Sequence, residues 1–132
     1  MKNLFILLVT IFTVLISCKK DNSISNILTE VTTTEEYNEA KNEGVSLIFF
    51  HATWCSICKE QRPLIEEATK LESLENVFFG QVDYEVNEDI RTADNVTGFP
   101  TMLIFKDGLE KERLTGKGHS TEKIELLLKE YL

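Results

Sequence analysis

Two cysteines separated by two residues are the most reactive feature of the sequence. Cys55 and Cys58 lie in "FFHATWCSICKEQRP", residues 49–63, directly after an apolar run and directly before a segment with helical spacing. A helix that begins near Ser56 would place Cys55 at its N-terminus, where free backbone N–H groups and the helix dipole favour a thiolate. Cys58 would lie one turn inside, shielded but within reach of Cys55. The pair is therefore predicted to open and close a disulfide, with Cys55 attacking and Cys58 resolving.

Two other uses of this cysteine spacing are less favoured. A closed zinc site needs four ligands, and the only histidines that could complete it, His51 and His119, lie far apart in the sequence. A purely structural disulfide would remove little entropy from the unfolded chain, because the loop that it closes is very short. The sequence also lacks a glycine-rich nucleotide-binding motif. We therefore expect neither a metal ion nor a cofactor.

The segments that must position the cysteines alternate between strand and helix. Apolar and β-branched runs predict strands at residues 26–31, 45–50, 77–84, 101–105 and 110–115. Helical spacing and capping residues predict helices that begin at Thr32 or Thr33, at Ser56, near residue 87, and at Ser120 or Thr121. The first should end at Gly44 and the second near Leu71, with a kink at Pro63. The order βαβαβαββα predicts an α/β fold, with a central mixed sheet and helices on both faces.

Several motifs together resemble the thioredoxin family. They are "ATWCSICK" followed by Pro63, "GFPT" at 98–101, "FKDG" at 105–108, and Gly116. This resemblance implies a thioredoxin fold over a domain at residues 27–132. It also implies the activity of a thiol-disulfide oxidoreductase that exchanges electrons between its cysteine pair and the disulfides of other proteins.

The resemblance further implies how the site is built. In the family, the proline before the threonine is cis and faces the cysteines, and the residue before it pairs its backbone with an extended substrate segment. Trp54 and Phe99 would form an apolar rim, although both could instead be core residues, and the proline could be an ordinary trans turn residue. The implied substrate-binding residues are Trp54, Ile57, Phe99, Pro100 and Thr101.

Two positions depart from the family pattern. Family members usually carry a buried carboxylate six residues before the first cysteine, and a lysine partner on the neighbouring strand; here the residues are Phe49 and Gln81. The usual proton relay is therefore absent. Strand alternation places His51 on the same face as Phe49 and nearer the cysteines, which makes it a candidate proton acceptor or thiolate partner. A packing or solvated histidine without a chemical role is the alternative.

The N-terminal segment predicts export and lipidation. Residues 1–17 read as a lipoprotein signal peptide, because a basic start precedes 13 uncharged residues, Leu4–Ile16. The stretch "LISC" ends at Cys18 and resembles a lipobox, so Cys18 is the expected lipidation site and residues 18–26 the lipidated tether. Ordinary signal cleavage, which would leave Cys18 as a free thiol, is the alternative. The expected location is the periplasm-facing bacterial cell envelope, with Lys19 slightly favouring the outer membrane.

Composition and charge limit the partners. The chain has 132 residues, 42% hydrophobic, and a net charge of −8, which suits one small acidic domain and argues against nucleic acid. The expected partners are disulfide-containing exported proteins, a membrane thiol-electron carrier, and the membrane itself through the lipid anchor. A reductase is favoured, because Ser56 and Ile57 supply no histidine of the kind found between the cysteines of oxidising relatives. A periplasmic disulfide oxidase or isomerase and a redox-inert binding module are the alternatives.

Overall fold

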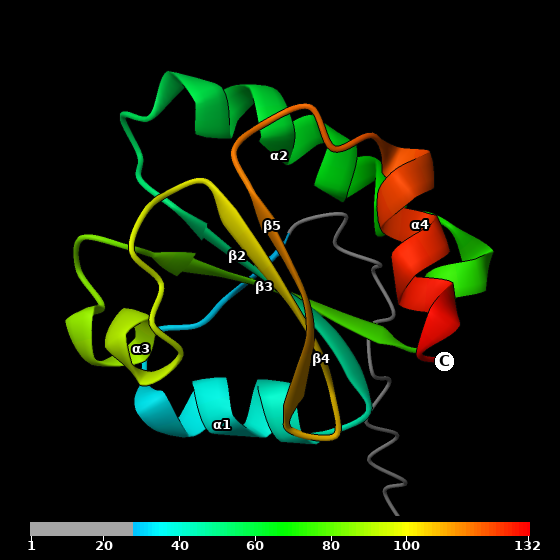
Figure 1. The fold of residues 1–132 in the computed structure, drawn as a ribbon, viewed down its shortest axis with the longest axis horizontal. Coiled ribbons are helices and arrows are strands. Elements are labelled where there is room, and N and C mark those ends of the chain that lie inside the picture. Colours follow the sequence, from blue (N-terminus) through cyan, green and yellow to red (C-terminus); the bar gives the residue numbers. More distant parts are fainter. Residues whose placement is uncertain (1–27) are drawn as a thin grey trace, which may run out of the picture.

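A five-stranded mixed sheet with helices on both faces forms the fold (Figure 1). The structure, a computed structural model, describes residues 28–132. The strands are β1 (Thr29–Glu30), β2 (Val45–His51), β3 (Val77–Asp83), β4 (Thr101–Lys106) and β5 (Leu109–Thr115). The helices are α1 (Thr34–Asn42), α2 (Ser56–Ala68), the 3₁₀ turn η1 (Glu72–Leu74), α3 (Glu88–Ala93) and α4 (Thr121–Glu130). The predicted fold class and the predicted order of the main strands and helices are confirmed.

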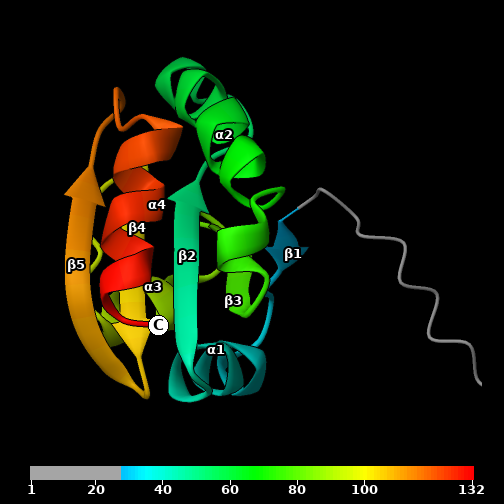
Figure 2. The same cartoon turned by 90° about the vertical axis from the view of Figure 1, so that its right-hand side faces the viewer.

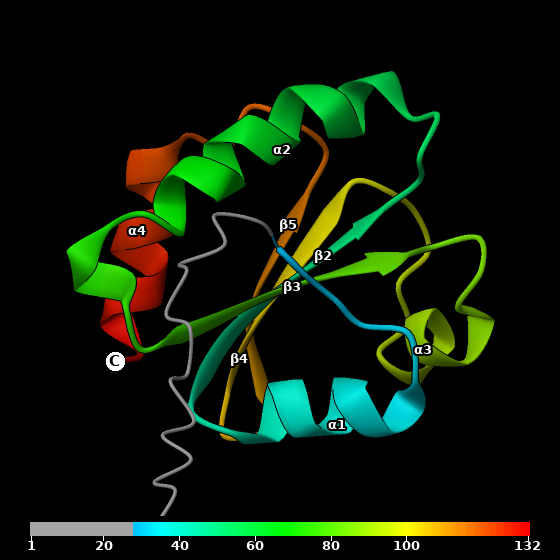
Figure 3. The ribbon, with the colours of Figure 1, turned by 180° about the vertical axis from the view of Figure 1, so that it is seen from behind.

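The strand order β1-β3-β2-β4-β5 places β2 at the centre of the sheet (Figure 2). β2 pairs in parallel with β3 and antiparallel with β4, and β4 continues into β5 through a tight turn. Figures 1 and 3, seen from opposite sides, place α2 and α4 on one face and α1 and α3 on the other. The parallel strands β2 and β3 therefore direct their carboxyl ends, and the loops that follow, toward the same edge.

Strand β2 is buried along its whole length, as its continuous apolar run predicts. Its side chains alternate between two core clusters. Leu47 and Phe49 join the cluster that contains residues of α2 and α4, whereas Ile48 and Phe50 join the cluster around α1 and α3. The strand is therefore packed between the two cores, and its end at His51 leads directly into the cysteine loop.

Some predicted boundaries differ from the structure. β1 contains only two residues, because it lies at the sheet edge and pairs with β3 alone. α2 ends at Ala68 rather than near Leu71, because the chain turns there into η1 and buries Leu74. The predicted capping box of Thr33 and Glu36 is confirmed at the start of α1. The predicted signal peptide, the tether and Cys18 lie outside the described residues.

Candidate active site

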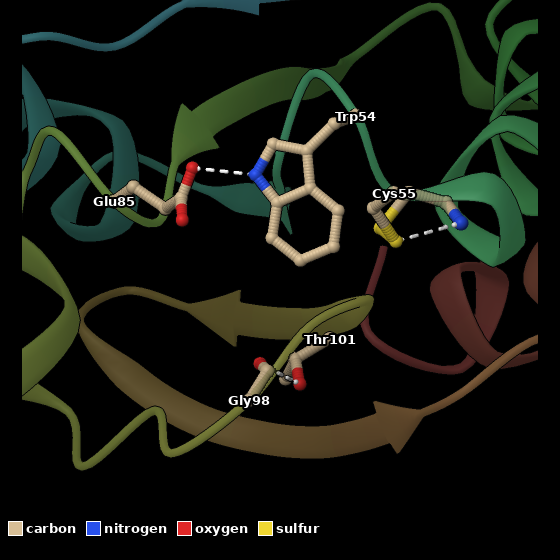
Figure 4. The surroundings of a disulfide bond; sticks show 6 residues. Trp54, Cys55, Glu85, Gly98 and Thr101 are labelled. Carbon is tan, nitrogen blue, oxygen red and sulfur yellow. Dashed lines mark hydrogen bonds between the residues drawn. A yellow bond between two sulfur atoms is a disulfide. The ribbon is translucent and has the colours of Figure 1, made fainter.

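Cys55 and Cys58 form a disulfide at the start of α2 (Figure 4). Their Cα atoms are 5.2 Å apart, and the Sγ atom of Cys55, which is the N-cap residue, accepts a hydrogen bond from the backbone N–H of Cys58 at 3.1 Å. Both cysteines are buried, with exposed fractions of 4% and 2%. The expected difference in exposure between the two cysteines is therefore absent in the disulfide form. The predicted helix-start position of Cys55 is confirmed.

The loop that carries the cysteines is short and tied to the end of β2. The backbone N–H of Cys55 donates to the carbonyl of Ala52 at 3.2 Å, which closes a turn between strand and helix. The first turn of α2 contains no acidic residue. The Cys58 N–H at this helix end therefore donates to the sulfur of Cys55, and no carboxylate in the first turn competes for it.

The loop before β4 faces the cysteine pair. The Phe99–Pro100 peptide bond is cis, as the resemblance implied. Pro100 is buried and its carbonyl accepts the backbone N–H of Gly116 at 2.9 Å. The hydroxyl of Thr101 donates to the carbonyl of Gly98 at 2.8 Å, and Thr101 is only 3% exposed. The Thr101 side chain therefore braces the loop, and its predicted part in substrate binding stays a prediction.

An aromatic rim borders the disulfide. Trp54 is 64% exposed, Ile57 is 38% exposed, and Phe99 is half-buried, so Trp54 is not a core residue. The rings of Trp54 and Phe99 pack edge to face, with centroids 5.5 Å apart. The Phe99 ring also packs against the Tyr84 ring, with centroids 4.9 Å apart. These exposed and half-exposed side chains give a partner protein an apolar surface beside the reactive sulfurs.

A carboxylate that the sequence did not single out fixes the orientation of Trp54. The indole N–H of Trp54 donates to Glu85 Oε2 at 2.8 Å (Figure 4). Glu85 and its neighbour Tyr84 follow β3 directly, as the cysteine loop follows β2. The carboxyl ends of parallel strands share one sheet edge. The position of Tyr84 and Glu85 directly after a predicted strand could therefore have identified them as neighbours of the cysteine loop.

The position of the family's buried carboxylate is filled by an aromatic pair. Phe49 is fully buried and lies opposite Gln81 in the β2–β3 register, where the family pattern would place carboxylate and lysine. The His51 ring stacks on the Phe49 ring, with centroids 5.5 Å apart and planes at 15°. The predicted shared face is confirmed. His51 is only 7% exposed, so the alternative of a solvated histidine is wrong.

The environment of His51 favours its neutral form. Burial lowers the pKa of His51 below its ordinary value, and the positive charge of Arg62 lowers it further, whereas Glu30 and Asp83 act in the opposite direction. The buried Nε2 atom has no hydrogen-bond partner among residues 28–132. A neutral imidazole with an unpaired nitrogen is able to accept a proton or to donate one.

The described residues contain neither a cluster of metal ligands nor a membrane-spanning helix. In the part of the chain that the structure covers, no three His, Cys, Asp or Glu side chains are grouped so that they could hold a metal ion. Over the same residues, no helix is both long and apolar enough to cross a bilayer. His119 contacts the Thr115 carbonyl and Lys123 and is not brought to the cysteines.

Comparisons with known proteins agree with this geometry. The family model described as Thioredoxin matches residues 28–130. Thioredoxin of Coprinus comatus is 30% identical over 87 residues, 65% of this chain and 82% of that protein; thioredoxin of Mycoplasma genitalium is 30% identical over 101 residues, 76% and 97% of the two chains. The crystal structure of oxidized mitochondrial thioredoxin 3 from Saccharomyces cerevisiae superposes with a TM-score of 0.66 at 27% identity, covering 78% of this chain and 94% of that one. The chain therefore belongs to the thioredoxin family and, with its Cys55–Cys58 disulfide, is a thioredoxin-type thiol-disulfide oxidoreductase rather than a redox-inert binding module.

Proposed function

We propose that this oxidoreductase reduces disulfides of exported proteins, with Cys55 as the attacking thiol and Cys58 as the resolving thiol. The observation that carries the proposal is the hydrogen bond from the Cys58 backbone N–H to the Cys55 sulfur at the N-terminus of α2. The same N–H and helix end favour negative charge on that sulfur once the disulfide is opened. No comparable donor to the Cys58 sulfur is found among residues 28–132.

The reaction consists of two exchanges. The Cys55 thiolate attacks one sulfur of the substrate disulfide, which forms a mixed disulfide and releases the first substrate thiolate. Cys58 then loses its proton and attacks the Cys55 sulfur, which restores the Cys55–Cys58 disulfide and releases the second substrate thiolate. The substrate gains two electrons and the enzyme's dithiol loses two. We assign the Cys58 proton to His51, because its unpaired nitrogen lies on the face of the sheet that carries α2.

The proposed location is the periplasm-facing cell envelope of a bacterium, with a lipid on Cys18. Support comes from the apolar run and the "LISC" stretch that end at this cysteine. A membrane thiol-electron carrier would return the two electrons by the reverse exchange. Labelling cells with a palmitate analogue should mark the wild-type protein but not a Cys18→Ser variant, and an unlabelled wild-type protein would contradict the anchor.

Trapping of mixed disulfides tests the assignment of the cysteines. In a Cys58→Ser variant the second exchange is blocked, so partner proteins should accumulate on Cys55; the matched Cys55→Ser variant should trap few. Accumulation on Cys58 instead would reverse the assignment. The reduction potential of the wild-type protein in a thiol buffer separates a reductase from an oxidase or isomerase, which would have a less negative potential.

A further inference from the structure

Three polar side chains form a hydrogen-bonded row that crosses the sheet next to the buried aromatic pair. Arg62 of α2 donates through Nη1 to Gln81 Oε1 at 2.5 Å, and Gln81 donates through Nε2 to Glu30 Oε2, also at 2.5 Å. Gln81 lies opposite Phe49 in one register and opposite Glu30 in the other. The hydrogen-bonded row therefore runs from the edge strand β1, across β3, to the helix that carries the cysteines.

This hydrogen-bonded row holds the Arg62 guanidinium over the Phe49 ring. The guanidinium carbon lies 5.4 Å from the ring centroid, and the His51 ring lies 5.5 Å from the same centroid. Phe49 is fully buried and the Arg62 side chain is only 26% exposed. Arg62 also forms an ion pair with Glu66 of α2 at 3.8 Å, so its charge near His51 is partly offset, but it is screened less by solvent than a charge on the open surface would be. Arg62 follows Cys58 by four residues, so both lie on one face of α2.

We propose that Arg62, held by Gln81 and Glu30, is a positioning residue that keeps His51 neutral and therefore ready to take the proton that Cys58 loses. The inference rests on the proposed function for the catalytic use of His51, but the electrostatic control itself can be measured without any reaction. This role of Arg62 explains how a site without the family's carboxylate and lysine still contains a fixed charge. Arg62 supplies that charge from the helix instead of from the neighbouring strand.

Five influences act on the pKa of His51. Burial and the Arg62 charge from α2 disfavour the imidazolium, whereas Glu30 on β1, Asp83 on β3 and a hydrogen bond with the Ala52 backbone favour it. Asp83 lies directly opposite His51 in the β2–β3 register. Removal of Arg62 should therefore shift His51 toward the protonated form, and removal of the Glu30 charge should shift it the other way.

Proton NMR titration of the purified protein tests this directly, because the chain has only two histidines. A His119→Gln variant assigns the His51 signal. In Arg62→Met the His51 midpoint should move to higher pH, and in Arg62→Lys it should stay near the wild-type value. In Glu30→Gln, an exposed position that is expected to fold normally, it should move to lower pH. Arg91→Met is the matched control, since Arg91 also stacks on an aromatic ring, that of Tyr84, but belongs to α3 on the opposite face.

The outcomes separate this inference from the proposed function. Opposite shifts in Arg62→Met and Glu30→Gln, with no shift in Arg91→Met, support the control of His51 by Arg62. An unchanged His51 midpoint in Arg62→Met overturns it, as does a shift of equal size in Arg91→Met. The acid limb of the resolution rate should follow the NMR midpoint in each variant. If His51→Ala leaves the rate and its pH profile unchanged, the proposed proton acceptor is wrong, whatever the NMR midpoints show.

Discussion

Replacing Phe49 by aspartate should weaken the fold and accelerate catalysis together. Phe49 is fully buried in the central strand, and truncation of a buried phenylalanine costs about 3–5 kcal/mol. A buried carboxyl adds a desolvation penalty unless it is paired, but the Arg62 guanidinium lies 5.4 Å from the ring centroid and can become its partner. We therefore expect Phe49→Asp to lower the free energy of unfolding by about 3–5 kcal/mol, within the ~5–15 kcal/mol typical of a domain.

The gain in rate should appear in the resolving step, because the new carboxylate can accept the Cys58 proton. Stopped-flow measurement of the decay of a preformed mixed disulfide gives this rate, and urea unfolding followed through Trp54, the only tryptophan, gives the stability. Phe49→Leu is the matched control, since it removes the ring without adding an acid. Equal resolution rates in Phe49→Asp and Phe49→Leu would refute the reasoning that proton acceptance limits this step.

Three other predictions concern stability and binding. Because burial lowers the pKa of His51 in the folded state, the unfolded chain binds a proton more readily than the folded one. The free energy of unfolding should therefore fall as pH drops below the ordinary histidine range. Urea unfolding across pH should show a flatter trend in His51→Gln. Glu85→Ala removes the acceptor of the Trp54 N–H and should raise KM for a protein disulfide about two- to tenfold, with a smaller change for a small-molecule disulfide. Ser120→Ala removes the cap of α4 and should lower the free energy of unfolding by about 1 kcal/mol, measured in the same way; no loss would contradict the capping role.

Local patterns were sufficient to predict the strands, the helix starts and the cysteine site. The unbroken apolar run of β2 predicted a strand buried on both faces, and its period of two placed His51 on the face of Phe49, where the two rings stack. The resemblance to the thioredoxin family implied that Pro100 is cis, as it is. These features depend on residues close in sequence, or on a motif, so they could be predicted without coordinates.

The contacts of long polar side chains could not be predicted in the same way. Arg62 could have pointed to solvent from its place on α2; its actual direction depends on Gln81, 19 residues away, and through it on Glu30 in β1. Likewise, the pairing of Trp54 with Glu85 joins two loops that are adjacent only after the sheet has formed. Such contacts depend on strand order and helix orientation, which a single sequence determines only through the complete fold.

The two edges of the sheet affect how copies of the protein behave when crowded. β1 offers only two residues for pairing, and β5 alternates acidic and basic side chains along its exposed length, Glu110, Lys111, Glu112 and Arg113. A short edge and a charged edge are poor templates for strand pairing between molecules, because pairing would bring unmatched charges together or bury few hydrogen bonds. Neighbouring copies should therefore resist aggregation through their sheets even at high concentration. The aromatic rim is then the main exposed apolar contact near the disulfide.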